Sequence, residues 1–282
     1  MKYFSTRNSN EKVSASWAIS HGLAPDGGLY VPESLPQFSL DDIINLGKSD
    51  YRGRAFGIIK PFLDEFTEDE LKAMILRAYG DNFDSADTAP VHFLDEKTAV
   101  LELWHGPTCA FKDMALQMLP HLLTASLKKC GERRKVCILV ATSGDTGKAA
   151  LEGFADVENT KILVFYPHNG VSDVQQLQMV TQTGDNVGVA AVRGNFDDAQ
   201  TGVKQIFGDA AFAEQLSAKG WFLSSANSIN WGRLLPQIVY YFSAYCDYAN
   251  SGRVNYGDAV DFVVPTGNFG NILACWYAKN MG

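Results

Sequence analysis

The stretch VCILVATSGDTGKAA, residues 136–150, decides the fold class. Six apolar residues run directly into a turn with two glycines, and a helix-forming segment follows. Two more apolar runs, residues 162–166 and 187–192, continue the pattern with starts 26 and 25 residues apart. Because a parallel strand and its crossover helix take about 30 residues, this spacing predicts βαβ units with strands buried on both faces. We expect crossover helices over 146–155 and 172–183, hence an α/β fold with parallel sheet.

The flanking segments complete this prediction. Thr67 with Glu70, and Ser39 with Asp42, have the spacing of capping boxes, so the region before residue 95 is expected to be mainly helical. A long helix should start near Lys112 and kink at Pro120. Further predicted elements are a helix over 230–246, a buried strand over 259–264 and a helix over 270–279.

Composition limits the possible partners. The 282 residues carry 24 Lys+Arg against 32 Asp+Glu, a net charge of −8, which argues against nucleic acid or an anionic membrane as the main partner. The first residues lack the apolar core of a signal peptide, and no apolar run reaches the ~18 residues of a membrane helix. Five cysteines without a C-x-x-C pair read as reduced thiols, so we expect a cytoplasmic protein.

Two glycine-bearing turns after apolar runs are candidate anion sites. Residues 264–271, VPTGNFGN, place glycines where a strand passes into a helix, which suits a phosphate; a tight turn without ligand is the alternative. Residues 141–149, ATSGDTGKA, resemble a Walker A loop, but Thr142 and Ala149 stand where that motif needs Gly and Ser or Thr. This turn suits a carboxylate or phosphate, and a well-capped helix is its alternative.

Two further segments carry basic groups. Lys112 lies where the loop 104–111 enters a helix; a lysine held near a buried site can form a Schiff base, although most lysines are simply solvated. Residues 227–233, NSINWGR, bring amides, a hydroxyl and Arg233 to another helix start, suited to gripping an anion or, alternatively, to capping with a surface ion pair. The five histidines show no metal-ligand spacing, so we expect no metal site, and no G-x-S-x-G elbow is present.

Taken together and in order, these segments resemble the threonine synthase family of pyridoxal-phosphate enzymes, fold type II, the group that includes the tryptophan synthase β-subunit. The opening YFSTR (residues 3–7), GGLYVP (27–32), GPT with FKD (106–113), TSGDTG (142–147), NSINWGR (227–233) and PTGNFGN (265–271) carry the resemblance over essentially the whole chain. It implies two parallel-sheet domains and a largely helical N-terminal region. The implied boundaries are 1–95 for the N-terminal region, 96–134 with 224–282 for the large cofactor domain, and 135–223 for the small α/β domain.

The resemblance also implies roles for individual residues. Lys112 would hold pyridoxal phosphate through a Schiff base and act as the catalytic base. The cofactor phosphate would bind to Gly267, Asn268, Phe269, Gly270 and Asn271. The substrate carboxylate would bind to Ser143, Asp145 and Thr146. The phosphate of O-phospho-L-homoserine would bind to Asn227, Ser228 and Arg233.

The implied reaction converts O-phospho-L-homoserine and water to L-threonine and phosphate, by β,γ-elimination and replacement. Alternatives are a threonine-synthase-like phospholyase that releases 2-oxobutyrate, or a non-catalytic anion-binding protein on the same fold. A serine/threonine dehydratase is disfavoured because its substrate has no phosphate for residues 227–233 to bind. Family members continue past residue 282, where they supply the partner of the pyridine nitrogen, so we expect this chain alone to be impaired. The sequence does not predict an oligomeric state.

Overall fold

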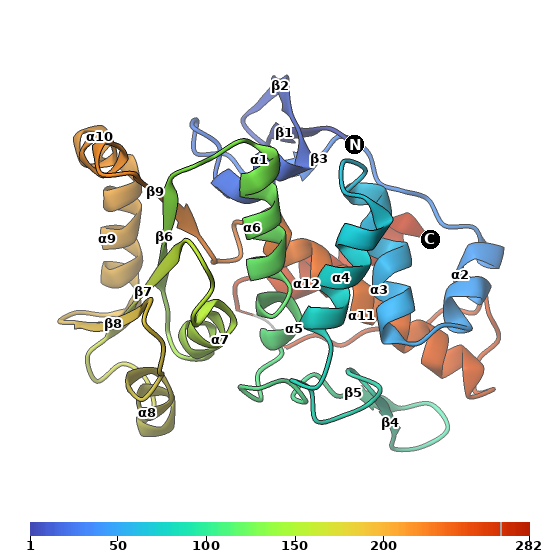
Figure 1. The fold of residues 1–282 in the computed structure, drawn as a ribbon. Coiled ribbons are helices and arrows are strands. Elements are labelled where there is room, and N and C mark those ends of the chain that lie inside the picture. Colours follow the sequence, from blue (N-terminus) through green and yellow to red (C-terminus); the bar gives the residue numbers. More distant parts are fainter. Residues whose placement is uncertain (266) are drawn as a thin grey trace.

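The computed structural model describes residues 1–265 and 267–282 and confirms the α/β fold (Figure 1). A four-stranded parallel sheet forms one side of the molecule. Its strands, in spatial order, are β8 (Val187–Val192), β7 (Thr160–Pro167), β6 (Lys135–Ala141) and β9 (Trp221–Ser225). The three apolar runs are thus confirmed as strands. The fourth strand, β9, is not among the predicted elements; it crosses the expected boundary at residue 223, and the division into domains stays a prediction.

Helices cover both faces of this sheet. They are α7 (Asp145–Phe154), α8 (Asp173–Val180), α9 (Phe196–Gly208) and α10 (Ala210–Ala218). In Figure 1, α7 lies on one face, while α9 and α10 lie on the other. The predicted crossover helices are confirmed as α7 and α8, and Ser172 caps α8 by accepting from the Gln175 N–H. The carboxyl ends of β6 and β9 therefore lead straight into the loops that the sequence marks as anion sites.

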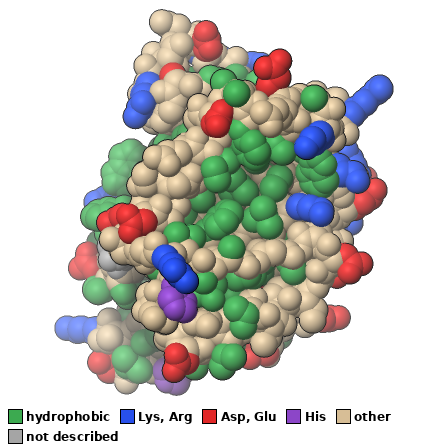
Figure 2. Space-filling model, turned by 90° about the vertical axis from the view of Figure 1, so that its left-hand side faces the viewer, with side chains coloured by type: hydrophobic (Ala, Val, Ile, Leu, Met, Phe, Trp, Pro, Cys, Tyr) green, Lys and Arg blue, Asp and Glu red, His purple; other side chains and the backbone are tan. Residues whose placement is uncertain are grey.

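The strand β8 differs from the expectation of strands buried on both faces. It is the edge strand, and its Ala190 and Ala191 are exposed. Hydrophobic side chains gather on this side of the molecule, between flanking charged ones (Figure 2). An edge strand has a neighbour on one side only, so an apolar sequence does not by itself ensure burial.

The N-terminal region is helical, as predicted, but also contains strands, of which only β3 (Tyr30–Pro32) corresponds to an expected element, the short strand that the sequence predicts at residues 29–31. Its helices are α1 (Ala15–His21), α2 (Leu40–Gly47), α3 (Tyr51–Ile59), the 3-10 helix η1 (Lys60–Phe62) and α4 (Glu68–Ala78). Both predicted capping boxes are present, at Ser39 and at Thr67. An antiparallel sheet joins β1 (Tyr3–Ser5) to β2 (Asn8–Val13) and β3 (Tyr30–Pro32), and β4 (Val91–Phe93) pairs with β5 (Ala99–Leu101). The strands of three residues are too short to show a period-2 pattern, and the six-residue β2, NSNEKV, is too polar to show one.

The predicted kink at Pro120 is a complete break into α5 (Asp113–Leu116) and α6 (Leu119–Lys129). Proline has no N–H to donate to the carbonyl four residues earlier, which is that of Leu116. Helix α7 passes close to this carbonyl, since a Cβ on Gly153 would lie 2.1 Å from the Leu116 oxygen. The break therefore sets the short helix that begins after Lys112 directly against α7.

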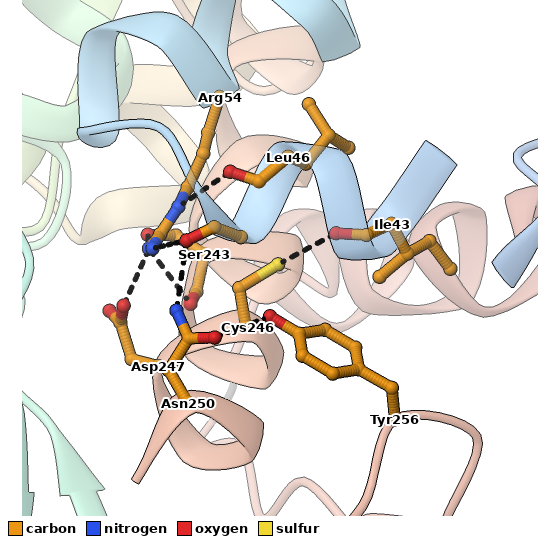
Figure 3. Close-up of polar contacts among 9 residues, drawn as sticks. Ile43, Leu46, Arg54, Ser243, Cys246, Asp247, Asn250 and Tyr256 are labelled. Carbon is orange, nitrogen blue, oxygen red and sulfur yellow. Dashed lines mark hydrogen bonds and ion pairs between the residues drawn. The ribbon is translucent and has the colours of Figure 1, made fainter. Parts of the chain in front are cut away.

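Helix α11 (Trp231–Asn250) is the central element of the remaining core, buried nearly all round and packed on α12 (Gly270–Met281), α3 and α5. Arg54 of α3, 6% exposed, fixes the N-terminal region to it (Figure 3). Its guanidinium donates to Asp247 Oδ1 at 2.6 Å, to Ser243 Oγ at 2.8 Å and to the carbonyls of Leu46 and Gly47. This arginine is therefore buried with a carboxylate partner and a nearly complete set of acceptors.

The expectation of a buried strand over 259–264 is wrong. These residues form no strand, and Val263 is 96% exposed. A strand needs a neighbouring strand to hydrogen-bond, and none runs beside this segment in the described part of the chain. Within the residues that the structure describes, the four-stranded sheet is the only parallel sheet, and the second parallel-sheet domain stays a prediction. Among residues 1–265 and 267–282, no helix is long and apolar enough to cross a membrane.

Candidate active site

One pocket of about 410 Å³ brings the predicted site residues together at the carboxyl end of the parallel sheet. It is lined by Lys112, Ser143, Asp145, Thr146, Ser228, Arg233, Gly267, Asn268, Phe269, Gly270 and Asn271, with Phe111, Gln175, Gln237 and Pro265. Asn227 alone among the predicted residues does not line it. A larger cavity, about 550 Å³, lies between α2, α11 and α12 and contains none of the predicted site residues. The four segments that carry the motifs therefore converge on one place.

The loop before Lys112 is fixed by a buried carboxylate. Asp113, 0% exposed, accepts from the Thr108 N–H at 2.8 Å and from the Thr108 hydroxyl at 2.6 Å. Burial raises the pKa of Asp113, and the two bonds from Thr108 oppose that rise. A Cβ on Gly106 would lie 2.5 Å from the Asp113 Cβ, so the loop can close over this side chain only with glycine there. Lys112 consequently starts α5 from a rigid support.

Lys112 points into the pocket with little exposure to solvent. Its Nζ lies 3.4 Å from Asp145 Oδ2 and 4.3 Å from the centre of the Phe111 ring. Burial lowers the pKa of Lys112; Asp145 acts in the opposite direction, and Arg233 adds to the lowering. A lysine in such surroundings gives up its proton more readily than a surface lysine and is a better nucleophile and base.

The turn between β6 and α7 is built around the Thr142 hydroxyl. This hydroxyl accepts from the N–H groups of Gly144 at 3.0 Å and Gly147 at 2.9 Å, and donates to the Gly144 carbonyl. Gly144 has φ +147°, in the region that favours glycine. Thr142 thus acts inside the turn, while Ser143 and Asp145 project outward into the pocket. Ser143, Asp145 and Thr146 stand at the N-terminus of α7, where an anion is stabilised.

Arg233 is a buried cation without a carboxylate. It is 3% exposed, and one of its NH groups donates to the Ala226 carbonyl at 2.8 Å while the other lies 3.5 Å from Thr146 Oγ1. Its Nε has no acceptor, and no carboxylate pairs with it among the described residues. Burial lowers the pKa of Arg233 to about 10. Since a buried charge needs compensation, the pocket is chemically suited to an anion.

The predicted phosphate cup lines the same pocket and lies against Ser228, since a Cβ on Gly270 would be 3.4 Å from the Ser228 side chain. Phe269 takes a left-handed conformation, φ 57°, and α12 starts at Gly270. The first N–H groups of any helix lack acceptors within it, and here they open toward the pocket. Asn271 does not reach outward, because its side-chain oxygen accepts from the hydroxyls of Tyr240 and Tyr241, the latter at 2.6 Å. It anchors the start of α12, and Thr266 of the predicted motif lies outside the described residues.

Asn227 and three unpredicted residues complete the arrangement. The Asn227 amide donates to the Ala141 carbonyl at 3.2 Å, tying the loop after β9 to the end of β6; its predicted contact with substrate stays a prediction. Gln175 donates to Asp145 Oδ1 at 2.7 Å, and Gln237 donates to the Arg233 carbonyl at 3.0 Å. Phe111 lies under Lys112. Of Gln175, Gln237 and Phe111, only Phe111 could have been found from the sequence, because it directly precedes Lys112.

The described residues contain no cluster of three or more His, Cys, Asp or Glu side chains suited to a metal ion. All five cysteines are free, which agrees with the expectation of thiols rather than disulfides.

Comparison with known proteins agrees with this geometry. The family described as "Threonine synthase N terminus" matches residues 2–79. Threonine synthase of Pseudomonas aeruginosa is 46% identical over 283 residues, covering 100% of this chain and 58% of that protein. Threonine synthase-like 1 of Homo sapiens is 44% identical over 285 residues, covering 96% of this chain and 38% of that protein.

A solved structure of PLP-bound threonine synthase from Brucella melitensis matches with a TM-score of 0.88 and 43% sequence identity, covering 100% of this chain and 58% of that one. The chain thus spans little more than half the length of the curated and solved threonine synthases it matches. Identity at this level over the whole chain, together with a shared fold, reflects common descent. The chain therefore belongs to the threonine synthase family.

Proposed function

We propose that this chain forms the cofactor-anchoring and phosphate-binding part of a pyridoxal-phosphate-dependent threonine synthase, a lyase acting on O-phospho-L-homoserine. The observation that carries the proposal is a single pocket in which Lys112, with its lowered pKa, faces the unpaired guanidinium of Arg233 and two helix N-termini. A relative with a bound PLP and the same fold supports the cofactor.

The pocket fits pyridoxal phosphate on its own chemistry. A primary amine of lowered pKa, a glycine-bearing helix start and about 410 Å³ of space match an aldehyde, a phosphate and a small ring. When bound, the group supplies an electron sink that acidifies the substrate's α-proton. Residues 267–271 would hold the cofactor phosphate, and Lys112 would hold the cofactor and move the α-proton.

Two anion sites remain for the substrate. Ser143, Asp145 and Thr146, at the start of α7, would bind the α-carboxylate with their backbone N–H groups, because the Asp145 side chain already accepts from Gln175 and Lys112. Asn227, Ser228 and Arg233 would bind the γ-phosphate, and the Asn227 amide also holds their loop to the Ala141 carbonyl. Negative charge builds on the phosphate as it leaves, and a buried guanidinium stabilises that charge more effectively than one in water. Arg233 would therefore act in the elimination step as well as in binding.

The remaining expectations belong to the same proposal. The small domain, residues 135–223, would close on the substrate and exclude water other than the molecule that adds. A cytoplasmic location would be tested by cell fractionation.

The function is tested by incubating the protein and pyridoxal phosphate with O-phospho-L-homoserine and identifying both products. Phosphate with L-threonine in equal amounts is the expected result. Phosphate with 2-oxobutyrate would replace the synthase by a phospholyase. If the product of the whole reading frame neither released phosphate nor bound the cofactor, the proposal would be refuted and a non-catalytic anion-binding protein would be favoured.

A further inference from the structure

Gln175 links the N-termini of two helices at the edge of the pocket. It is the third residue of α8, and its side-chain Oε1 accepts from the Ser172 N–H at 3.2 Å, as one half of a capping box. Its Nε2 donates to Asp145 Oδ1 at 2.7 Å, at the start of α7. The other oxygen of Asp145 lies 3.4 Å from Lys112 Nζ. The three side chains thus form one line from the α8 cap to the reactive amine.

The cap determines which way the Gln175 amide faces. With Oε1 committed to the Ser172 N–H, only the NH₂ group can face Asp145. The reverse orientation would place an amide oxygen against a carboxylate and an NH₂ group against an N–H donor, losing both bonds. The amide is therefore a donor with a fixed direction, which is what orienting a carboxylate requires.

The turn before α7 is shaped to admit this amide. A Cβ on Gly144 would lie 2.4 Å from Gln175 Nε2 and 2.5 Å from its Cδ. Gly144 therefore serves two purposes: its φ of +147° forms the turn, and its missing side chain leaves room for Gln175.

We propose that Gln175 is a positioning residue: through its hydrogen bond to Asp145 Oδ1 it holds Asp145 Oδ2 against Lys112, and so sets the protonation of the reactive amine. This inference rests on the proposed function for the role of Lys112. The charged groups that face Lys112 are Asp145 from α7, Asp113 from α5 and Arg233 from α11. Of these, only Asp145 is held by Gln175, so a change at Gln175 reaches Lys112 through that carboxylate.

The test measures Lys112 itself, on protein without cofactor. Limiting acetic anhydride acetylates unprotonated amines. Mass spectrometry of the peptide that contains Lys112 then gives the acetylation rate of Lys112 at each pH from neutral to alkaline. Gln175→Met removes the donor and keeps the side-chain length. If Asp145 then leaves Lys112 part of the time, the pKa of Lys112 falls, and labelling below that pKa becomes faster by about two- to fivefold, the range for loss of a partly exposed ion pair.

Two further variants separate positioning from helix stability. Ser172→Ala removes the hydroxyl that caps α8 but leaves the Ser172 N–H that orients Gln175, so labelling of Lys112 should stay at the wild-type rate. Asp145→Asn should speed labelling by at least as much as Gln175→Met. In the Asp145→Asn background, adding Gln175→Met should have no further effect, because the residue through which Gln175 acts has lost its charge.

Equal acceleration in Ser172→Ala and Gln175→Met would overturn the inference, because the effect would then come from α8 unwinding. Additive effects of Gln175→Met and Asp145→Asn would also overturn it, as would an unchanged pH profile in Gln175→Met. These outcomes are independent of product formation. Loss of the threonine synthase assignment would leave the labelling result standing, and failure of the labelling prediction would leave that assignment untouched.

Discussion

Two buried arginines in this chain should respond in opposite ways to the same substitution. Arg233 is 3% exposed and has no carboxylate partner among the described residues, whereas Arg54 is 6% exposed and pairs with Asp247 at 2.6 Å. Replacing each with methionine removes the charge and keeps much of the volume. The first substitution deletes an uncompensated cation, and the second leaves a half-buried carboxylate behind.

The expected change in unfolding free energy for Arg233→Met follows from the pKa of Arg233. Burial lowers that pKa from 12.5 to about 10, which corresponds to about 3 kcal/mol against the charged form at neutral pH. The bond from Arg233 to the Ala226 carbonyl is lost as well, at a cost of about 1–2 kcal/mol. We therefore expect the ligand-free Arg233→Met protein to be as stable as the wild type or more stable, by up to about 2 kcal/mol. Arg54→Met should lower the unfolding free energy by about 3–5 kcal/mol, because it leaves the Asp247 carboxylate without its partner.

Urea unfolding with and without inorganic phosphate measures both effects. Phosphate should raise the unfolding free energy of the wild type in proportion to the logarithm of its concentration, once it exceeds its dissociation constant. Arg233→Met should lose the part of that protection that comes from the substrate-phosphate site and keep only the part that comes from the cup of residues 267–271, whereas any Arg54→Met protein that folds should keep all of it. If Arg233→Met were as destabilising as Arg54→Met, and phosphate protected both equally, Arg233 would be a structural residue and the assignment of the substrate-phosphate site would be refuted.

Three other changes have definite expected outcomes. Lys112→Ala should abolish turnover in the product of the whole reading frame, whereas Lys148→Ala, which removes a lysine paired with Glu152 on α7, should keep most of it; comparable activity in both would contradict the role of Lys112. Gly144→Ala should cost about 1–3 kcal/mol of unfolding free energy, because φ there is +147° and the new Cβ would meet Gln175, while Gly208→Ala, with nothing within 4 Å, should be nearly neutral in the same urea titration. Glu102 and Asp84 raise the pKa of His105 above 6.5, so the stability from this cluster is complete below about pH 6.5 and is lost as pH rises through the raised pKa. Unfolding free energies of His105→Gln should lack that loss, and parallel pH curves for variant and wild type would show that the cluster contributes nothing.

The parallel sheet could be predicted because its strands are short apolar runs at βαβ spacing. The capping boxes at Ser39 and Thr67 could also be predicted, since each pattern lies within four consecutive residues. The segment 259–264 carries the same apolar signal yet forms no strand, because pairing depends on a neighbour that local sequence does not reveal. The edge position of β8 has the same cause: strand order is set by topology, not by the strand's own residues.

Within the site, residues that follow glycine turns could be predicted, and their supports could not. Gln175 is separated from Asp145 by 30 residues, and only the packing of α8 beside α7 brings them together. Asn271 belongs to the predicted cup, but two tyrosines from α11 turn its side chain into an anchor. Asn227 reads as an anion ligand in sequence; its amide donates to the Ala141 carbonyl, a contact that the local sequence does not reveal, and its contact with substrate stays a prediction. In each case a polar side chain satisfies a partner that is distant in sequence.

The central claim is that Lys112 holds the cofactor in the pocket formed with Arg233 and residues 267–271. The most direct measurement is reduction with borohydride after incubation with pyridoxal phosphate, followed by peptide mapping. We predict that the pyridoxyl group is found on Lys112 and that inorganic phosphate slows its incorporation there by competing for the cup. Labelling spread over surface lysines, with Lys112 unmodified and phosphate without effect, would contradict the claim.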